Sequence, residues 1–341
     1  MAKYGLPYMG SKSKICDDII CLFPRADNFY DIFGGGFSIT QAMLERRSSH
    51  YKKFYFNEIR PGICDLIKDA IAGKYNYDVF SPDWISKDKF LKMVDSDPYI
   101  KLCWSFGNNG KGYIFGGDIK PYKKSMHNAI VFNEFDYLAE KVLGLSKFHD
   151  GMSINARRLF LMDRIERFRL NGIPDFLKPF LSEQQLQQLK QLKRLEQLER
   201  LERLQQLERL EQLLQLLRLQ QLQRLQQLQQ LQRLTFYNKS YDEIKIKQNS
   251  IIYCDPPYLN TASYDNDFNH KDFYDWADAQ ENPVFISEYT LPDKRFHLLK
   301  VIKKRSLLSS NKNDSKLKNE CVFINRAAKE TLIKLKKQRK V

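Results

Sequence analysis

The chain lacks paired cysteines. Its six cysteines are scattered over 341 residues, with no CxxC pair and no histidine close by. Structural zinc sites and disulfide-stapled domains need clustered or paired cysteines, so the sequence argues against both kinds of protein. The cysteines are Cys16, Cys21, Cys64, Cys103, Cys254 and Cys321.

The chain also lacks a long apolar run. No stretch approaches the ~20 apolar residues that a helix needs to cross a bilayer. Residues 1–14 contain no apolar core typical of a signal sequence. We therefore expect no membrane association and a cytoplasmic location, where a reducing environment suits unpaired cysteines.

Acidic residues are the minority among the charged residues. The chain has 41 acidic and 56 basic residues, a net charge of +15 and a pI near 9.3. From Lys294 onward, 16 lysines and arginines face 3 acidic residues. Such a tail is typical of proteins that bind polyanions, nucleic acid first. It is equally typical of a solvated helix that only keeps a protein soluble.

Residues 183–234 lack every residue type except Leu, Gln, Glu, Lys and Arg, and Leu recurs at every third position from Leu186 to Leu234. All five types favour helix. Three residues turn an α-helix by only about 300°, so the leucine stripe circles the helix and no single flat partner covers it. We expect broken or paired α-helices, although a 3₁₀ helix would align the leucines. The segment is either an expansion tolerated in a surface connection or a means of self-association.

The most informative motif follows an apolar run. Residues 251–254 predict a buried strand, and Asp255-Pro256-Pro257-Tyr258 follows directly. Proline fixes its own φ and restricts the residue before it, so the turn holds the carboxylate and carbonyls in one geometry. Such oxygens accept the hydrogens of an exocyclic amine, and a tyrosine ring covers the attached heterocycle. The motif indicates an aminated base as substrate, although alone it is also typical of a strand-ending turn.

A second motif lies near the amino terminus. Residues 28–38 predict a strand, a glycine turn and a helix through Glu45. Glycines at such a turn allow a ligand to approach the backbone and the helix amides. A second strand over residues 54–57 ends in Glu58, placed like the acid that binds ribose hydroxyls in nucleotide-binding sheets. Alone, the pattern is also typical of a structural turn and a surface acid.

Together with Pro7-Tyr8-Met9-Gly10-Ser11-Lys12, these motifs resemble in type and order the DNA adenine-N6 methyltransferases of the Dam-like group. The resemblance spans roughly residues 4–180 and 235–300. Two positions depart from the family pattern, because Phe37 and Ser11 stand where the family usually has glycine.

The resemblance implies S-adenosylmethionine as cofactor and an adenine flipped out of double-stranded DNA as substrate. Asp255 and the Pro256 carbonyl would accept the amine hydrogens, with Pro257 shaping the turn and Tyr258 stacking on the base. The implied cofactor site contains Tyr8, Lys12, Asp31, Phe33, Gly34, Gly35, Gly36, Ser38, Glu58 and Asp255.

The alternation of helix and strand from residue 3 to about 72 predicts an α/β fold, a doubly wound Rossmann-like methyltransferase sheet. We predict a first methyltransferase part at 1–74, a smaller DNA target-recognition region at 75–181, a helical Leu/Gln-rich insertion at 182–234, and a second methyltransferase part with the basic tail at 235–341. Within the last part, residues 235–246 predict a short helix and a turn. Residues 284–287 predict a buried strand, and residues 321–324 an antiparallel edge strand.

The recognition region is rich in aromatic and basic residues, and residues 107–112 predict a hairpin tip. An insertion with these residues at this place resembles the family's target-recognition domain, in which basic side chains would meet phosphates and aromatic or amide groups would meet bases or fill the gap left by an extruded base. Alone, the pattern is also typical of a plain hairpin with buried aromatic side chains. A helix over residues 155–170 either follows a phosphate backbone or packs as core with solvated arginines. The candidate DNA-binding residues are Asn108, Asn109, Lys111, Lys120, Tyr122, Lys123 and Lys124.

Two other functions stay open from the sequence. Cytosine-N4 methylation presents the same kind of amine, although that group more often has Ser in place of Asp255. A DNA-binding or assembly protein that has lost activity is the alternative outside enzymes. The sequence does not reveal the recognition site, the oligomeric state or a link to restriction-modification.

Overall fold

The computed structural model describes residues 4–115, 120–171, 231–259, 268–304 and 318–338. Two compact units divide the chain: residues 1–71 with 224–341, and residues 72–223. The predicted helical insertion lies outside the described residues up to residue 230. Among its last residues, Leu231–Arg233 form a 3₁₀ turn and Leu234 begins a strand.

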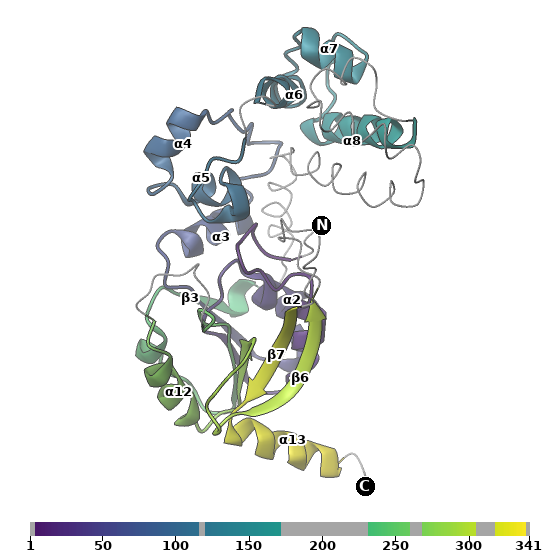
Figure 1. The fold of residues 1–341 in the computed structure, drawn as a ribbon. Coiled ribbons are helices and arrows are strands. Elements are labelled where there is room, and N and C mark those ends of the chain that lie inside the picture. The colour runs from purple at the N-terminus through teal and green to yellow at the C-terminus, as the bar shows by residue number, and fades with distance from the viewer. Residues whose placement is uncertain (1–3, 116–119, 172–230, 260–267, 305–317, 339–341) are drawn as a thin grey trace, which may run out of the picture. The chain divides into compact units, whose positions relative to one another are not determined.

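The first unit contains a seven-stranded sheet with the order β3-β2-β1-β4-β5-β7-β6. Five neighbouring strands are parallel, and β7 is antiparallel to both β5 and β6. The predicted α/β class is confirmed (Figure 1). The strands are β1 (Asn28–Asp31), β2 (Lys53–Asn57), β3 (Leu234–Tyr237), β4 (Ser250–Cys254), β5 (Val284–Glu288), β6 (His297–Lys304) and β7 (Lys318–Ile324).

The helices before the second unit follow the predicted alternation. They are α1 (Cys16–Ile20), α2 (Ser38–Arg46) and α3 (Ile63–Ile71), separated by β1 and β2. After the DPPY motif come α12 (His270–Asp278) and the terminal α13 (Arg326–Gln338).

Aromatic and aliphatic side chains cover both faces of the sheet. On one face, Tyr30 and Ile252 pack with Phe273 of α12. On the other, the Phe23 ring contacts Phe29 and also the rings of Tyr253 and Phe285. The alternation of neighbouring residues between two buried faces explains why the central strands are apolar throughout.

Two sequence predictions for the second half of this unit are wrong. Residues 234–237 form β3 rather than a short helix, because Thr235, Phe236 and Tyr237 favour strand and pair with β2. The strand at 318–324 is antiparallel as predicted but is not the edge, since β6 pairs with its outer side. The charged sequence of β6 concealed it, because an edge strand tolerates lysines.

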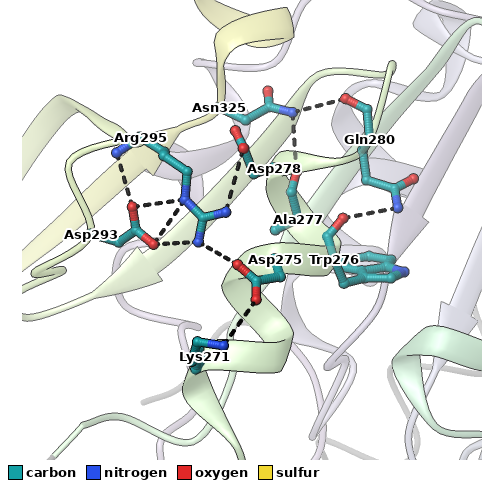
Figure 2. Close-up of polar contacts among 9 residues, drawn as sticks. All are labelled: Lys271, Asp275, Trp276, Ala277, Asp278, Gln280, Asp293, Arg295 and Asn325. Carbon is teal, nitrogen blue, oxygen red and sulfur yellow. Dashed lines mark hydrogen bonds and ion pairs between the residues drawn. The ribbon is translucent and has the colours of Figure 1, made fainter.

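A polar cluster fastens α12 to the end of the sheet (Figure 2). The Arg295 guanidinium contacts Asp293, Asp275 and Asp278. Asn325 is buried and donates to the carbonyls of Ala277, Gln280 and Asn282, while its side-chain oxygen accepts from the backbone of Val284 and Ala328. Asn325 thus joins the end of α12, the start of β5 and the start of α13.

The second unit is helical where it is described. Its helices are α4 (Lys87–Met93), α5 (Pro98–Cys103), α6 (Lys120–Phe132), α7 (Tyr137–Leu143) and α8 (Ile154–Asn171). Its core contains Trp84, Trp104 and Phe115, whose rings contact one another. Burial lowers the pKa of the adjacent His127 to about 4, and its ring nitrogen lies 2.7 Å from the Pro82 carbonyl oxygen.

Candidate active site

The two sequence motifs meet at the carboxyl ends of the central strands β1 and β4. β1 and β4 are parallel neighbours, with Asp31 opposite Tyr253, so Asp255 follows two residues beyond that pair. Strand order reverses between them, because the chain continues from β1 to β2 on one side and from β4 to β5 on the other. Ligands bind outside the carboxyl ends of parallel strands at such a reversal. The topology therefore places Asp31, the glycine turn and DPPY together.

The glycine turn is closely packed against the amino-terminal segment. The Gly36 carbonyl accepts from Leu6, and a Cβ added to Gly36 would lie 2.5 Å from the Tyr8 Cβ. Gly35 has φ +51° and its amide donates to the Glu58 carboxylate at 2.8 Å. No larger side chain fits this path without displacing Tyr8.

Phe37 adopts the backbone conformation for which glycine is favoured. Its φ is 72°, a left-handed value that costs a non-glycine residue about 1 kcal/mol. The side chain is fully buried and its ring packs on Phe56 and Phe236, in the core of the sheet. The substitution therefore keeps the path of the turn, and core packing offsets the backbone strain.

The amino-terminal segment is held by hydrogen bonds that position Tyr8 and Lys12. The Tyr4 amide donates to the Ser13 hydroxyl, and the Gly5 amide donates to the Gln41 side chain of α2. Tyr8 lies against the glycine turn, with the Arg60 guanidinium 5.1 Å from its ring centre. Lys12 is 5% exposed and reaches the DPPY motif.

Asp31 is a buried carboxylate. One oxygen accepts from the Thr40 hydroxyl at 2.7 Å, and the other has no hydrogen-bond partner among the described residues. Burial raises its pKa to about 7, with the nearby charges of Asp255 and Glu58 acting in the same direction. A cation beside Asp31 would relieve this cost.

Asp255 is oriented by Lys12. The Lys12 ammonium lies 2.7 Å from Oδ2, while Oδ1 is buried without a partner in the described part of the chain. Burial raises the pKa of Asp255, the Lys12 charge lowers it and the Glu320 charge raises it. One oxygen is fixed, and the other is left as an acceptor.

Tyr258 lies between charged groups. Its hydroxyl donates to Glu320 Oε1, its ring contacts Tyr289 edge-on, and the Lys12 ammonium lies 4.7 Å from its ring centre. The Pro257 carbonyl accepts from His270 Nε2 at 2.8 Å, which braces the end of the motif.

Two glutamates in the site escaped the sequence analysis. Glu288 ends β5 and accepts from the amides of Leu259 and Tyr289, and burial raises its pKa to about 7. Glu320 lies on β7, is 1% exposed and lies 3.7 Å from the Lys12 ammonium. The predicted strand at 284–287 ended one residue before Glu288, and no motif marks Glu320.

Two predicted cofactor neighbours lie close to the turn in different settings. The Phe33 ring packs on Tyr241, Phe268 and Phe273, so part of it belongs to the core. Ser38 is buried at the first position of α2.

The predicted recognition loop of the second unit is closed. Ser105 and Tyr113 form an antiparallel bridge, and the Phe106 amide donates to the Gly112 carbonyl at 2.7 Å. The Asn108 side chain donates to the Leu102 carbonyl, and the Asn109 side chain accepts from the Lys111 amide, so both amides brace the loop.

The predicted basic contacts of this unit differ in exposure. Lys111 and Lys124 are exposed, and Lys120 and Tyr122 are half-buried. Lys123 lies 4.5 Å from the Phe115 ring centre, and burial lowers its pKa to about 8. In α8, the Arg157 side chain donates to the Ile130 and Val131 carbonyls, and Arg158 is buried.

No group of three or more His, Cys, Asp or Glu side chains in the described residues could hold a metal ion. None of their helices is long and apolar enough to cross a membrane.

Comparison with known families gives one match. Residues 215–333 match the family model described as D12 class N6 adenine-specific DNA methyltransferase. The matched range contains β3, β4, the DPPY motif and β5 to β7, and it ends within α13. No curated protein matches the chain.

Proposed function

We propose that this protein moves the methyl group of S-adenosylmethionine to an adenine flipped out of duplex DNA, in line with the match of residues 215–333 to the D12 class N6 adenine-specific DNA methyltransferase family. The unpartnered Oδ1 of Asp255 is the observation that carries the proposal. A buried acceptor at this edge of the sheet needs a hydrogen from a ligand, and an exocyclic amine provides one.

The charges of the site support a cationic methyl donor. Asp31, Glu58, Asp255, Glu288 and Glu320 gather around the edge of the sheet, and the Lys12 ammonium contacts Asp255 and Glu320. Uncompensated buried carboxylates are costly, so a ligand with positive charge stabilises them. S-adenosylmethionine carries a sulfonium and an ammonium, and when bound it supplies the electrophilic methyl group.

The proposed cofactor site consists of the glycine turn and its neighbours. Glu58, which ends the strand beside β1, would bind the ribose hydroxyls, and Asp31 would face positive charge. Tyr8 closes the outer side of the turn. The remaining members of the set are Lys12, Phe33, Gly34, Gly35, Gly36, Ser38 and Asp255.

The adenine amine would be bound by Asp255 and the Pro256 carbonyl. The N6 lone pair is delocalised into the ring, and acceptance of its hydrogens directs that pair toward the methyl group. Lys12 keeps Asp255 in one orientation. Because the Lys12 ammonium lies over one face of the Tyr258 ring, the base would stack on the other face or displace it.

The family match favours adenine over cytosine-N4 methylation and an enzyme over an inactive assembly protein. DNA is the substrate of this family. Binding of the duplex by the recognition loop, self-association through residues 182–234 and a cytoplasmic location stay predictions.

Replacement of Asp255 by Ala tests the proposal. We expect methylation of DNA to fall at least 100-fold, because the acceptor of the amine hydrogen is lost, while DNA binding is retained. Transfer of labelled methyl groups to adenine-containing DNA, with sequencing of modified bases, measures the first. A gel-shift titration measures the second.

The matched control is Asp65→Asn, since Asp65 is 77% exposed and its ion pair is with Lys68, one helical turn away. This variant should keep wild-type methylation. Full methylation by Asp255→Ala would contradict the proposed role of the carboxylate.

A further inference from the structure

Glu320 is a buried carboxylate that the proposed transfer does not yet use. It is 1% exposed, and one of its oxygens accepts the Tyr258 hydroxyl. The other oxygen, Oε2, has no hydrogen-bond partner within the described ranges. An ionised group in this position costs free energy of folding unless its neighbours compensate for it.

The reversal of β7 brings Glu320 to the site. β7 is antiparallel to β5, and Cys321 lies opposite Glu288 at the carboxyl end of β5. On its other side Glu320 pairs with Ile302 of β6. Because β6 pairs with its backbone and the ladder with β5 ends at the next residue, Cys321, the Glu320 side chain is a fixed point beside the more irregular segment that follows β4.

Two groups of the site depend on this fixed point. The Tyr258 hydroxyl is bonded to Glu320, and the Lys12 ammonium lies 3.7 Å from Glu320 and 2.7 Å from Asp255. Lys12 therefore lies between two carboxylates, Asp255 after the parallel strand β4 and Glu320 on the antiparallel strand β7. Loss of Glu320 would remove an acceptor of the Tyr258 hydroxyl and one of the two carboxylates that contact the Lys12 ammonium.

We propose that Glu320 is a positioning residue of the methyl transfer: it fixes the Tyr258 ring that receives the base and shares the Lys12 ammonium with Asp255. This inference rests on the proposed function. Glu320 acts through Tyr258 and Lys12 and touches neither the base nor the methyl group.

The charged and titratable groups around Glu320 come from three parts of the first unit. They are Lys12 of the amino-terminal segment, Asp255 and Tyr258 after β4, and Glu288 with Tyr289 at the end of β5. Glu320 raises the pKa of Asp255 by its negative charge. Its neutralisation should therefore lower that pKa and move the acid limb of kcat to lower pH.

The test compares Glu320→Gln, Glu320→Ala, Tyr258→Phe and the double variant Glu320→Ala/Tyr258→Phe. We expect Glu320→Ala to lower kcat about 10- to 100-fold, with KM for cofactor and DNA within about threefold of wild type. Glu320→Gln keeps an acceptor for the Tyr258 hydroxyl, so its kcat should fall less, with the acid limb shifted to lower pH.

The double variant separates positioning from independent effects. If Glu320 acts through the Tyr258 hydroxyl, the kcat of the double variant should be no lower than that of the less active single variant. The reason is that the effects of residues acting as a unit are not additive. Glu330→Gln on α13, 60% exposed, is the control for an acid removed elsewhere. Thermal melting and cofactor binding verify that each variant folds.

The outcomes distinguish the two proposals. DNA methylation by the wild type together with full kcat in Glu320→Ala, additive losses in the double variant, or an unmoved acid limb in Glu320→Gln would overturn the positioning role alone. A wild type that binds the cofactor but methylates no adenine would overturn the proposed function and this inference with it.

Discussion

At the scale of single residues, the site is governed by burial of charge. Asp31 and Glu288 both have a pKa raised to about 7 because the protein excludes water around them. At Phe37 the cost lies in the backbone: its unfavourable φ of 72° is offset by the packing of a fully buried ring. Each residue has a local cost that its surroundings or a ligand compensates.

The raised pKa of Asp31 predicts a dependence of stability on pH. An unfolded Asp titrates near 3.8 and the folded one near 7, so the folded state binds the proton more tightly between these values. Stability of the cofactor-free protein should therefore fall as pH rises from about 4 to about 7, by up to about 4 kcal/mol from this group. Asp31→Asn should lose this contribution, be at least as stable as wild type at pH 8, and bind S-adenosylmethionine weakly.

Thermal melting at pH 5 and pH 8 measures the effect. The difference in Tm between Asp31→Asn and wild type should be more positive at pH 8. The exposed Asp65→Asn serves as control. Parallel pH profiles for Asp31→Asn and wild type would contradict the assignment of the shift to Asp31.

At the scale of elements, the carboxyl ends of β1 and β4 place the two motifs together, and the antiparallel strand β7 adds Glu320 to the site. α13 begins at the other end of the sheet, beside the amino ends of the parallel strands, because Ile324 at the end of β7 pairs with Phe285 near the start of β5. Asn325 forms the joint between these elements (Figure 2).

Asn325→Ala should destabilise the first unit by about 2–4 kcal/mol. The change removes the partners of several buried backbone groups at once, and each unsatisfied group costs about 1–3 kcal/mol. Urea or thermal unfolding measures the loss. Asn319→Ala, an exposed position on β7, should change stability by less than about 0.5 kcal/mol. Equal stability of the two variants would show that the joint is unimportant.

At the scale of the whole molecule, the basic residues of α13 lie apart from the candidate active site of the first unit. The exposed Lys334, Lys336 and Lys337 belong to α13, which follows β7 and begins at the end of the sheet opposite the carboxyl ends of β1 and β4. The part of the predicted basic tail that forms α13 therefore does not line the candidate active site. The lysines of α13 would attract DNA over a distance. Salt screens such an attraction beyond about 8–10 Å.

Replacement of Lys334, Lys336 and Lys337 by Gln tests this separation. We expect unchanged kcat at saturating DNA, and weaker DNA binding at low ionic strength that approaches wild type at about 0.3 M salt. Binding titrations over a salt series measure it. A large loss of kcat would place α13 in the reaction. Lys111→Gln, in the predicted recognition loop of the second unit, is the comparison for a single removed charge.

Four of the five parallel strands, and the two motifs at their carboxyl ends, can be predicted from the sequence. Apolar runs bounded by turn residues identify β1, β2, β4 and β5, and the DPPY motif identifies the family that residues 215–333 match. These features are local, because each depends on residues that are neighbours in the chain.

The other features of the fold and the site depend on contacts between segments that are distant in the chain. β3 became a strand through pairing with β2 although its residues were expected to be helical, and β6 is a charged edge that periodicity does not reveal. Glu320 reaches Tyr258 across 62 positions of the chain, and Lys12 reaches Asp255 across a still longer separation. The physical reason is that strand order and reversal are set by packing between distant segments, so the partners of a buried charge cannot be inferred from its neighbours in sequence.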